Sequence, residues 1–396
     1  MERDSSNVLI RRKKAQTQSG LLSGDGRWLV LPSLNGEMIL TNLREKRQHR
    51  IPKENGGGKT LALTANAKWL LTHRTERLGR RRRISQITRW NLQADTPVAD
   101  RSLDGVSLPP AVIESSASPL SADGRWLVCL SLRGQRMKGA QMVDLSLTEP
   151  KVVAAIPILK RKPLFAMISE QGNWVATVEN NQTHLWRWKG DGIAKRPVFS
   201  IPGSHPVISR DEKRVAVANR QGAILLYRWT RTGPAAEKPR KLDLGGHLFQ
   251  IHFTPDNQWL VAAGSQNRIH LWNLAREEKA EVLVAPDSGF TRLALSADGR
   301  WIAAGSTSEV HIWDLSQKSI PSSRLRIANI PSFVQTMAFQ DSGPGLITDS
   351  VDGATRSWAL KLTSTLEQAK KQARRSLTPQ EKRRYLIPTQ PQGVNR

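Results

Sequence analysis

The most constraining feature of this sequence is a short unit that recurs along the chain. Its clearest copy, LSADGRWIAAGSTSEVHIWDL, ends at Leu315. Each copy has a polar turn, an apolar strand, a small-residue turn and a second strand that closes on an aromatic residue. The chain has 13 Trp against 2 Tyr and 7 Phe, which fits the copying of one Trp-bearing motif. We count eight copies, whose strands open at Trp28, Trp69, Trp126, Trp174, Val215, Trp259, Trp301 and Leu346.

The spacing of these copies predicts an all-β propeller. In four copies, twelve residues separate the opening position from the closing aromatic: Trp174 to Trp186, Val215 to Tyr227, Trp301 to Trp313, and Leu346 to Trp358. A period of roughly 40–45 residues with a Trp-Asp signature is typical of four-stranded blades around an axis. One blade cannot bury both of its faces, so neighbours stack and the ring closes. Residues 15–360 give roughly 43 residues per blade for eight blades and roughly 49 for seven, so we favour eight, with seven as the alternative.

Two basic segments flank the predicted propeller. Within residues 1–14, the stretch SNVLIRR is placed to pair with the last blade as a ring-closing outer strand, and a frayed tail is the alternative. In residues 361–396, the apolar residues Leu366, Ala369, Ala373 and Leu377 fall on helical spacing. A Thr-Pro pair at 378–379, with an acid at 381, is a typical start of a second helix. We therefore expect a C-terminal helical tail.

The repeats resemble those of WD-repeat β-propellers from about residue 7 to residue 360. WDL occurs at Trp313 to Leu315, WNL occurs at Trp90 and Trp272, and a Gly-His pair occurs at Gly246. The tail sequence LTPQEKRRY resembles the end of propellers in bacterial signalling proteins, planctomycete ones included. The resemblance implies a non-catalytic scaffold for protein–protein interaction. The tail adds a bacterial signalling context, in which this chain could be a regulatory sensor or a fragment of a larger protein.

Charge and cysteine content restrict the partners and the compartment. The 60 Lys and Arg exceed the 34 Asp and Glu, which gives a formal charge of +26. This excess favours anionic partners, although solubility and a species-wide basic bias explain it equally well. Cys129 is the only cysteine and lies in an apolar strand, which excludes a disulfide framework and fits a reducing, cytoplasmic compartment. No window is apolar enough for a secretory signal or a membrane span.

Several motifs that suggest chemistry have simpler explanations. NGGGKT, which ends at Thr60, lacks the first glycine of a phosphate-binding loop, because Lys53 stands there, and a strand follows it where a helix is required. His184, His270 and His311 occupy equivalent positions in three different blades, so they cannot share a tetrahedral metal. The acids of the ADGR-type turns, Asp25, Asp123 and Asp298, satisfy turn backbone in separate blades. We therefore predict no enzyme activity, no cofactor, no metal site and no small-molecule substrate.

Two basic insertions mark a candidate binding surface. Twenty-one residues separate Trp69 from Trp90, and the added piece contains Arg80, Arg81, Arg82 and Arg83. The next repeat is also lengthened and adds Arg133, Arg136 and Lys138. Both insertions fall in the connection between the middle strands, which the family places on the upper rim. We expect one patch that docks an acidic protein partner, with nucleic acid phosphates as the alternative ligand and a merely solvated loop as the simplest explanation.

Overall fold

The structure is a computed structural model of the 396-residue chain. It describes residues 7–11, 21–32, 37–52, 59–63, 68–78, 82–93, 97–104, 106–107, 118–133, 136–147, 149–157, 159, 163, 165–265, 267–276, 280–284, 292–306, 309–328, 330–340 and 345–359. The predicted helical tail at 361–396 and the glycines before Lys59 lie outside these residues.

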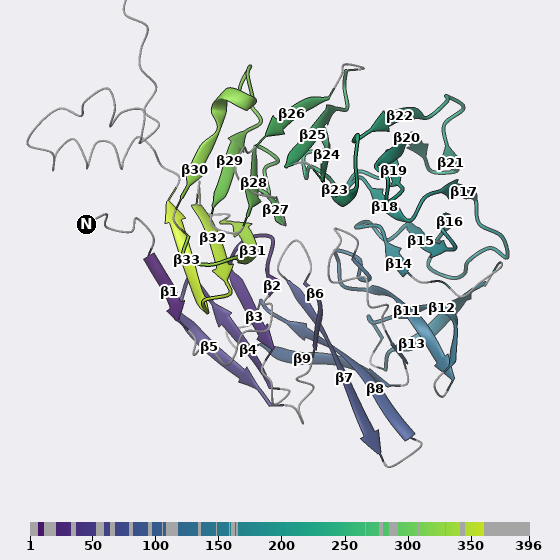
Figure 1. Cartoon of the computed structure of the whole chain (residues 1–396). Helices are drawn as coiled ribbons and strands as arrows, with labels where there is room; N and C mark the ends of the chain where they lie inside the picture. Colours follow the sequence, from purple (N-terminus) through teal and green to yellow (C-terminus); the bar gives the residue numbers. More distant parts are fainter. Residues whose placement is uncertain are drawn as a thin grey trace, which may run out of the picture.

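Eight antiparallel sheets form a ring, which confirms the predicted eight-bladed propeller (Figure 1). Blade 1 contains β2 (Leu21–Leu22), β3 (Trp28–Pro32), β4 (Met38–Asn42) and β5 (Arg47–Ile51). Blade 2 contains β6 (Lys59–Leu63), β7 (Trp69–Leu78), β8 (Arg82–Asn91) and β9 (Val98–Asp104). Blade 3 contains β10 (Val106–Ser107), β11 (Trp126–Arg133), β12 (Arg136–Asp144) and β13 (Lys151–Ile156). Blade 4 contains β14 (Phe165–Ile168), β15 (Trp174–Glu179), β16 (Gln182–Arg187) and β17 (Phe199–Pro202).

The second half of the ring repeats this order. Blade 5 contains β18 (His205–Ile208), β19 (Arg214–Ala218), β20 (Ala223–Thr230), β21 (Gly233–Pro234) and β22 (Arg240–Asp243). Blade 6 contains β23 (Leu248–Phe253), β24 (Trp259–Gly264), β25 (Arg268–Asn273) and β26 (Glu281–Val284). Blade 7 contains β27 (Arg292–Leu295), β28 (Trp301–Gly305), β29 (Val310–Asp314), the short helix η4 (Pro321–Ser323) and β30 (Leu325–Ile327). Blade 8 contains β31 (Val334–Phe339), β32 (Gly345–Ser350), β33 (Ala354–Ala359) and, from the other end of the chain, β1 (Asn7–Arg11).

The two ends of the propeller chain meet in blade 8. β1 lies antiparallel to β33, with Asn7 opposite Ser357 and Arg11 opposite Ala354 (Figure 1). Leu9 and Ile10 pack against a cluster of buried residues that includes Leu29 of blade 1. The fourth strand of the last blade therefore comes from the N-terminal segment, and it covers the edge that β33 would otherwise expose.

The core lies between neighbouring blades, because the strands bury both of their faces. One cluster joins Trp174 and Val178 of blade 4 to Val215 and Trp229 of blade 5. Three buried indoles donate their N–H to a threonine hydroxyl on the neighbouring strand: Trp90 to Thr72 at 3.0 Å, Trp186 to Thr177 at 2.9 Å and Trp358 to Thr348 at 2.9 Å. These bonds satisfy the only polar atom of a large apolar side chain, so the closing Trp of a repeat can be buried completely.

In blades 1, 3 and 7 the polar turn of the repeat is closed by hydrogen bonds within the turn itself. In blade 3, the Ser121 hydroxyl donates to Asp123 at 2.5 Å, and the backbone N–H of Trp126 donates to Ser121 at 2.9 Å. Gly124 between them has a φ of 76°, where a side chain would be strained. The turns at Asp25 and Asp298 have the same two bonds, from Ser23 and Trp28 and from Ser296 and Trp301. The predicted turn role of these acids is thus confirmed.

Candidate binding site on the upper rim

The connections between strands lie on two opposite rims of the propeller. The second and third strands of each blade are joined at one rim, which we name the upper rim. The first strand is joined to the second at the opposite, lower rim. Because every blade has the same strand order, the connections between β7 and β8 and between β11 and β12 lie on the upper rim in neighbouring blades.

The β7–β8 hairpin is much longer than its counterparts and projects from the ring (Figure 1). β7 and β8 have 10 residues each, whereas β15 and β16 have 6 and β28 and β29 have 5. Pairing with β6 ends at His73, and pairing with β9 ends at Gln86. Beyond these two residues the hairpin continues to the pair Leu78 and Arg82. The inserted residues therefore extend the two middle strands beyond the four-stranded sheet, a shape that repeat spacing alone did not specify.

The β11–β12 hairpin of blade 3 is also extended. β11 has 8 residues and β12 has 9, and their last pair is Arg133 opposite Arg136. Ser131 pairs with Gly139 and Leu132 with Met137, so Lys138 is an extra residue in a β-bulge. A bulge locally bends the strand and increases its twist.

The structure places most of the predicted site residues on these two hairpins. Arg82 and Arg83 lie in β8 opposite Leu78 and Arg77, and Arg133, Arg136 and Lys138 lie at the end of the β11–β12 hairpin. Arg80 and Arg81 lie outside the described residues.

A strand that changes sheets brings the two hairpins together. β9 is the outer strand of blade 2 and ends at Asp104, opposite Gln86 of β8. After one residue the chain forms β10, in which Val106 pairs with Ser131 of β11. Two residues span at most about 7 Å, so the edges of blades 2 and 3 are close at this height. β10 also contacts β8. The repeat pattern gave no indication of this crossover. Leu120, just before Trp126, forms a further bridge to Leu127 of β11.

Below the hairpins, blades 2 and 3 share a packed core. Trp69, Leu71 and Ile87 of blade 2 pack against Leu127 and Cys129 of blade 3. Burial raises the pKa of the Cys129 thiol to about 12. The base that carries both hairpins is therefore apolar and closely packed.

Arg89 also links blades 2 and 3 through polar contacts. Its guanidinium lies 4.1 Å from the centre of the Trp69 ring and forms an ion pair with Asp100. It also donates a hydrogen bond to the carbonyl of Gly124 in blade 3. Arg89 is buried, so its charge is compensated inside the protein and is not offered to a partner.

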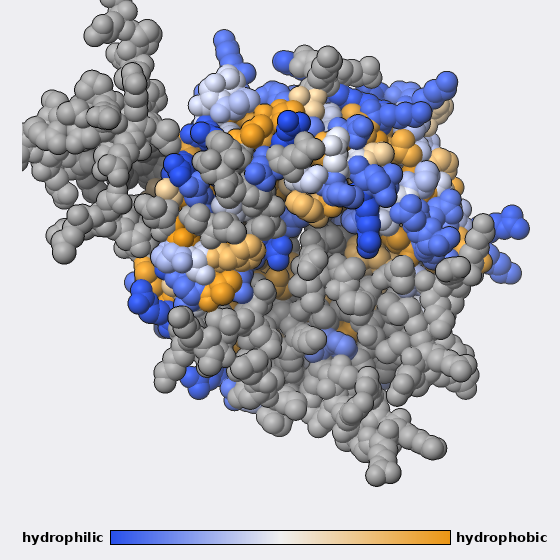
Figure 2. Space-filling model, in the orientation of Figure 1, coloured by the Kyte–Doolittle hydropathy of each residue, from blue (hydrophilic) through white to orange (hydrophobic). Residues whose placement is uncertain are grey.

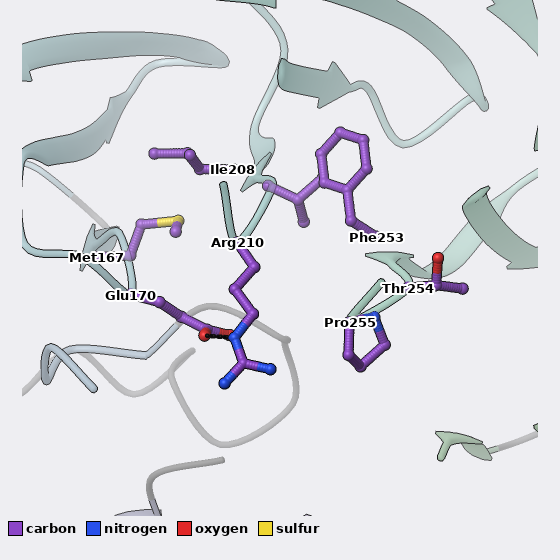
Figure 3. Close-up of a pocket in the computed structure, with 8 residues that line it drawn as sticks. Met167, Glu170, Ile208, Arg210, Phe253, Thr254 and Pro255 are labelled. Atoms are coloured by element: carbon purple, nitrogen blue, oxygen red, sulfur yellow. Dashed lines mark ion pairs between the residues drawn. The ribbon is translucent and has the colours of Figure 1, made fainter. Parts of the chain in front are cut away.

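A small cavity on the lower rim is the other concave feature we considered (Figure 3). It measures about 80 Å³ and is lined by Met167, Glu170, Val207, Ile208, Arg210, Phe253, Thr254 and Pro255. Two of the lining residues, Glu170 and Arg210, form an ion pair of 3.1 Å (Figure 3). Burial raises the pKa of Glu170, although the positive charge of Arg210 opposes this shift. The cavity is small, and the two charged side chains that line it pair with each other.

The described residues offer little for metal or membrane chemistry. They contain no group of three His, Cys, Asp or Glu side chains that could hold a metal ion. His184, His270 and His311 lie in β16, β25 and β29 of three separate sheets. Among the same residues, no helix has the length and apolar character needed to cross a bilayer. On the face shown in Figure 2, hydrophilic residues separate the apolar patches of the coloured surface.

Comparison with known proteins supports the class of the fold. Residues 238–273 and 278–314 match the family described as WD domain, G-beta repeat, so the chain contains WD40 repeats. Over 73 residues the chain is 32% identical to the uncharacterized WD repeat-containing protein sll1491 of Synechocystis sp.. This aligned region covers 18% of this chain and 21% of that protein.

A solved structure supports the architecture. The computationally designed Ika8 protein matches 89% of this chain and 99% of its own, with a TM-score of 0.57 and 13% identity, which is a likeness of fold alone. WD40 propellers are generally non-catalytic and typically bind protein partners. The fold and these matches therefore define an eight-bladed propeller that contains WD40 repeats.

Proposed function

We propose that this protein is a non-catalytic scaffold that docks an acidic protein partner on its upper rim, within a multiprotein assembly. The site consists of Arg80, Arg81, Arg82, Arg83, Arg133, Arg136 and Lys138. The observation that carries the proposal is the crossover from β9 to β10, which joins the two extended basic hairpins of blades 2 and 3. Two insertions that are separate in sequence therefore belong to adjacent blades, which supports a single patch.

The physical basis is the way in which arginine binds anions. A guanidinium group can form two parallel hydrogen bonds with a carboxylate, which adds geometric specificity to the charge attraction. A rigid ring that presents extended loops suits assembly, because it holds the binding groups in place while the loops provide variation. Docking to carboxylates requires no reacting group, in keeping with the non-catalytic character of the fold.

Nucleic acid is the second candidate ligand, since the same arginines can contact phosphates. The two ligands differ in how their affinity depends on salt. Each phosphate neutralised on duplex DNA contributes a slope of roughly −0.9 to the plot of log affinity against log salt. Changing Arg80, Arg81, Arg82 and Arg83 to Ser would then flatten that slope by up to about four units. Binding to an acidic protein depends on salt more gently, because screening at a rim mainly slows encounter.

The proposal is tested by affinity capture from the source cells with the wild-type protein and with the fourfold serine variant. We expect a specific acidic protein to be captured by the wild type and lost from the variant. A matched control changes Arg44 and Arg47 to Ser, two exposed arginines near the lower-rim connection of blade 1. If the fourfold variant still captures the partner, or if both proteins bind any duplex with a steep salt dependence, the proposal is wrong.

A further inference from the structure

The connections between the third and fourth strands of blades 4 and 5 carry an excess of positive charge. Both lie on the lower rim, because the third strand of a blade runs from the upper rim to the lower rim. Residues 187–200 and 228–241 together contain nine Lys and Arg against two acids, Asp191 and Glu237. The corresponding segment of blade 6, residues 273–284, has two basic residues and three acids. The excess therefore belongs to these two connections and is not a uniform property of the ring.

The two connections are in contact with each other at the outer side of the ring, where β21 lies beside β17 (Figure 1). The centre of the Phe199 ring in blade 4 lies 5.6 Å from that of Tyr227 and 6.2 Å from that of Trp229 in blade 5. Gly233, in the hairpin of β20 and β21, is so close to Val198 that an added Cβ atom would lie 2.9 Å from Val198 Cγ1. Residues on the two connections therefore form one continuous surface.

Buried tryptophans hold both connections in place. The backbone N–H of Trp188 donates to the carbonyl of Asn173 at 2.9 Å, and that of Trp229 donates to the carbonyl of Lys213 at 2.7 Å. Both indole rings are buried in the cores between blades. The surface is thus ordered before a partner arrives, which reduces the entropy lost on binding.

Most of the positive charge of these connections is exposed. Arg187 lies over the ring of Trp174, and Arg240 donates to a backbone carbonyl of blade 6, so both act within the protein. The other seven basic side chains are exposed: Lys189, Lys195, Arg196, Arg228, Arg231, Lys238 and Lys241. Within the part of the chain that the structure describes, Arg228 is the one member of this group with an ion pair, formed with Glu237.

Two of the exposed arginines flank an exposed apolar side chain. Val198 is 38% exposed, although it contacts the hairpin of blade 5. Arg196 precedes Val198 by two residues, and Arg231 precedes Gly233 by two residues. Because two residues span at most about 7 Å, both arginines lie near this contact. An apolar centre with arginines around it has the composition of a protein–protein interface.

We infer that Lys195, Arg196, Val198, Arg231 and Lys238 form a second docking surface, which binds an acidic segment of a partner protein that has an apolar residue between its acids. The apolar residue contacts Val198, and the carboxylates on either side accept hydrogen bonds from the two guanidinium groups. This inference goes beyond the proposed function, because it concerns the opposite rim and different blades. A scaffold that docks proteins on both rims can hold two partners at once.

The surface suits a protein segment better than a nucleic acid. The indole rings of its two connections, Trp188 and Trp229, are buried and cannot stack on nucleobases. A phosphate backbone has no apolar group to place against Val198, whereas an aliphatic side chain between two acids removes this exposed surface from water.

The test titrates a fluorescein-labelled peptide of glutamates with one central leucine into the full-length protein carrying R80S, R81S, R82S and R83S. These four substitutions weaken the upper-rim site, so the readout comes from the lower rim. In this background we expect R196S/R231S to lower the affinity at least ten-fold, as for the removal of charge-assisted hydrogen bonds. R44S/R47S removes the same charge near the lower rim of blade 1 and should change the affinity by less than about two-fold. Circular dichroism and melting temperature confirm that each variant is folded.

A second peptide, with glutamate in place of the leucine, tests the apolar centre. We expect V198S to weaken binding of the leucine peptide several-fold and to leave binding of the all-glutamate peptide unchanged. The inference is wrong if R196S/R231S binds the leucine peptide as its parent does, or if R44S/R47S weakens binding equally. It is also wrong if V198S affects both peptides alike. Tighter binding of a DNA duplex than of either peptide, lost in R196S/R231S, would assign the surface to nucleic acid. Failure of the upper-rim proposal is recognised separately, by capture of its partner with the fourfold serine variant alone.

Discussion

The hydroxyl group of Ser169 in blade 4 donates a hydrogen bond of 2.5 Å to the carboxylate of Glu212 in blade 5. The other oxygen of the same carboxylate accepts a bond of 2.9 Å from the Asn173 side chain. Glu212 has a φ of 55°, at the turn position that Gly124 and Gly299 occupy in other blades. Blade 4 has Gln171 where other turns have the capping Asp, so a neighbouring blade supplies the missing acceptor.

Replacement of Glu212 should therefore destabilise the protein through the contact between blades. We expect Glu212→Ala to lower the free energy of unfolding by about 1.5–3 kcal/mol, because it removes hydrogen bonds to a charged group. Glu212→Gly should cost less, since glycine relieves the backbone strain of about 1–2 kcal/mol while it loses the same bonds. Urea unfolding measures both. Glu237→Ala, which removes an exposed ion pair with Arg228, should change stability by less than about 0.5 kcal/mol. Equal losses in the alanine and glycine variants would show that the turn is not strained.

The stability of the protein should decrease as the pH falls below about 6.5, because of His252. Burial lowers the pKa of His252 to about 4, and its Nε2 atom has no hydrogen-bond partner among the described residues. The pKa of an unfolded histidine is about 6.5, so the stabilisation is complete above that pH and is lost as the pH falls toward 4. The linked loss is at most about 3 kcal/mol. We expect stability to depend less steeply on pH between 6.5 and 4 in His252→Leu than in the wild type, as measured by urea unfolding; parallel curves would contradict the assignment.

Cys129 should be inert in the folded protein. Its thiol is buried in the core between blades 2 and 3, and burial raises its pKa to about 12, so almost no thiolate exists at neutral pH. We expect a thiol reagent such as dithionitrobenzoate to react with the native protein at the rate of unfolding and with the denatured protein at once. Fast labelling of the native state would mean that blades 2 and 3 separate readily.

Removal of residues 1–13 should lower the melting temperature. The deletion removes β1, exposes the edge of β33 and uncovers the cluster against which Leu9 and Ile10 pack. We expect a loss of several degrees, as for a few kcal/mol in a protein of this size. Deletion of residues 1–6 alone leaves β1 in place and should have no effect. If both deletions leave the melting temperature unchanged, the pairing of β1 with β33 contributes nothing to stability.

The sequence did not predict the cavity at the lower rim or the contact of Glu212 with blade 4. Met167, Ile208 and Phe253 come from the ends of three first strands, so only the closure of the ring brings them together. Glu212 is an ordinary turn residue in the sequence. Glu212 accepts hydrogen bonds from blade 4 only because the two blades are adjacent, and a local sequence pattern carries no information about that adjacency.

The sequence by itself determined the repeat, the number of blades and the order of strands. These depend on local patterns: Trp openers, Ser and Asp turns, and alternating apolar strands have the same meaning in every blade. It also indicated two basic insertions. The tertiary structure decided that β9 continues into β10 across two sheets, and that the β7–β8 ladder extends beyond the four-stranded sheet to the pair Leu78 and Arg82. Such relationships depend on strand register and on which face of a sheet meets its neighbour, and a shift of one residue in register would reverse them all.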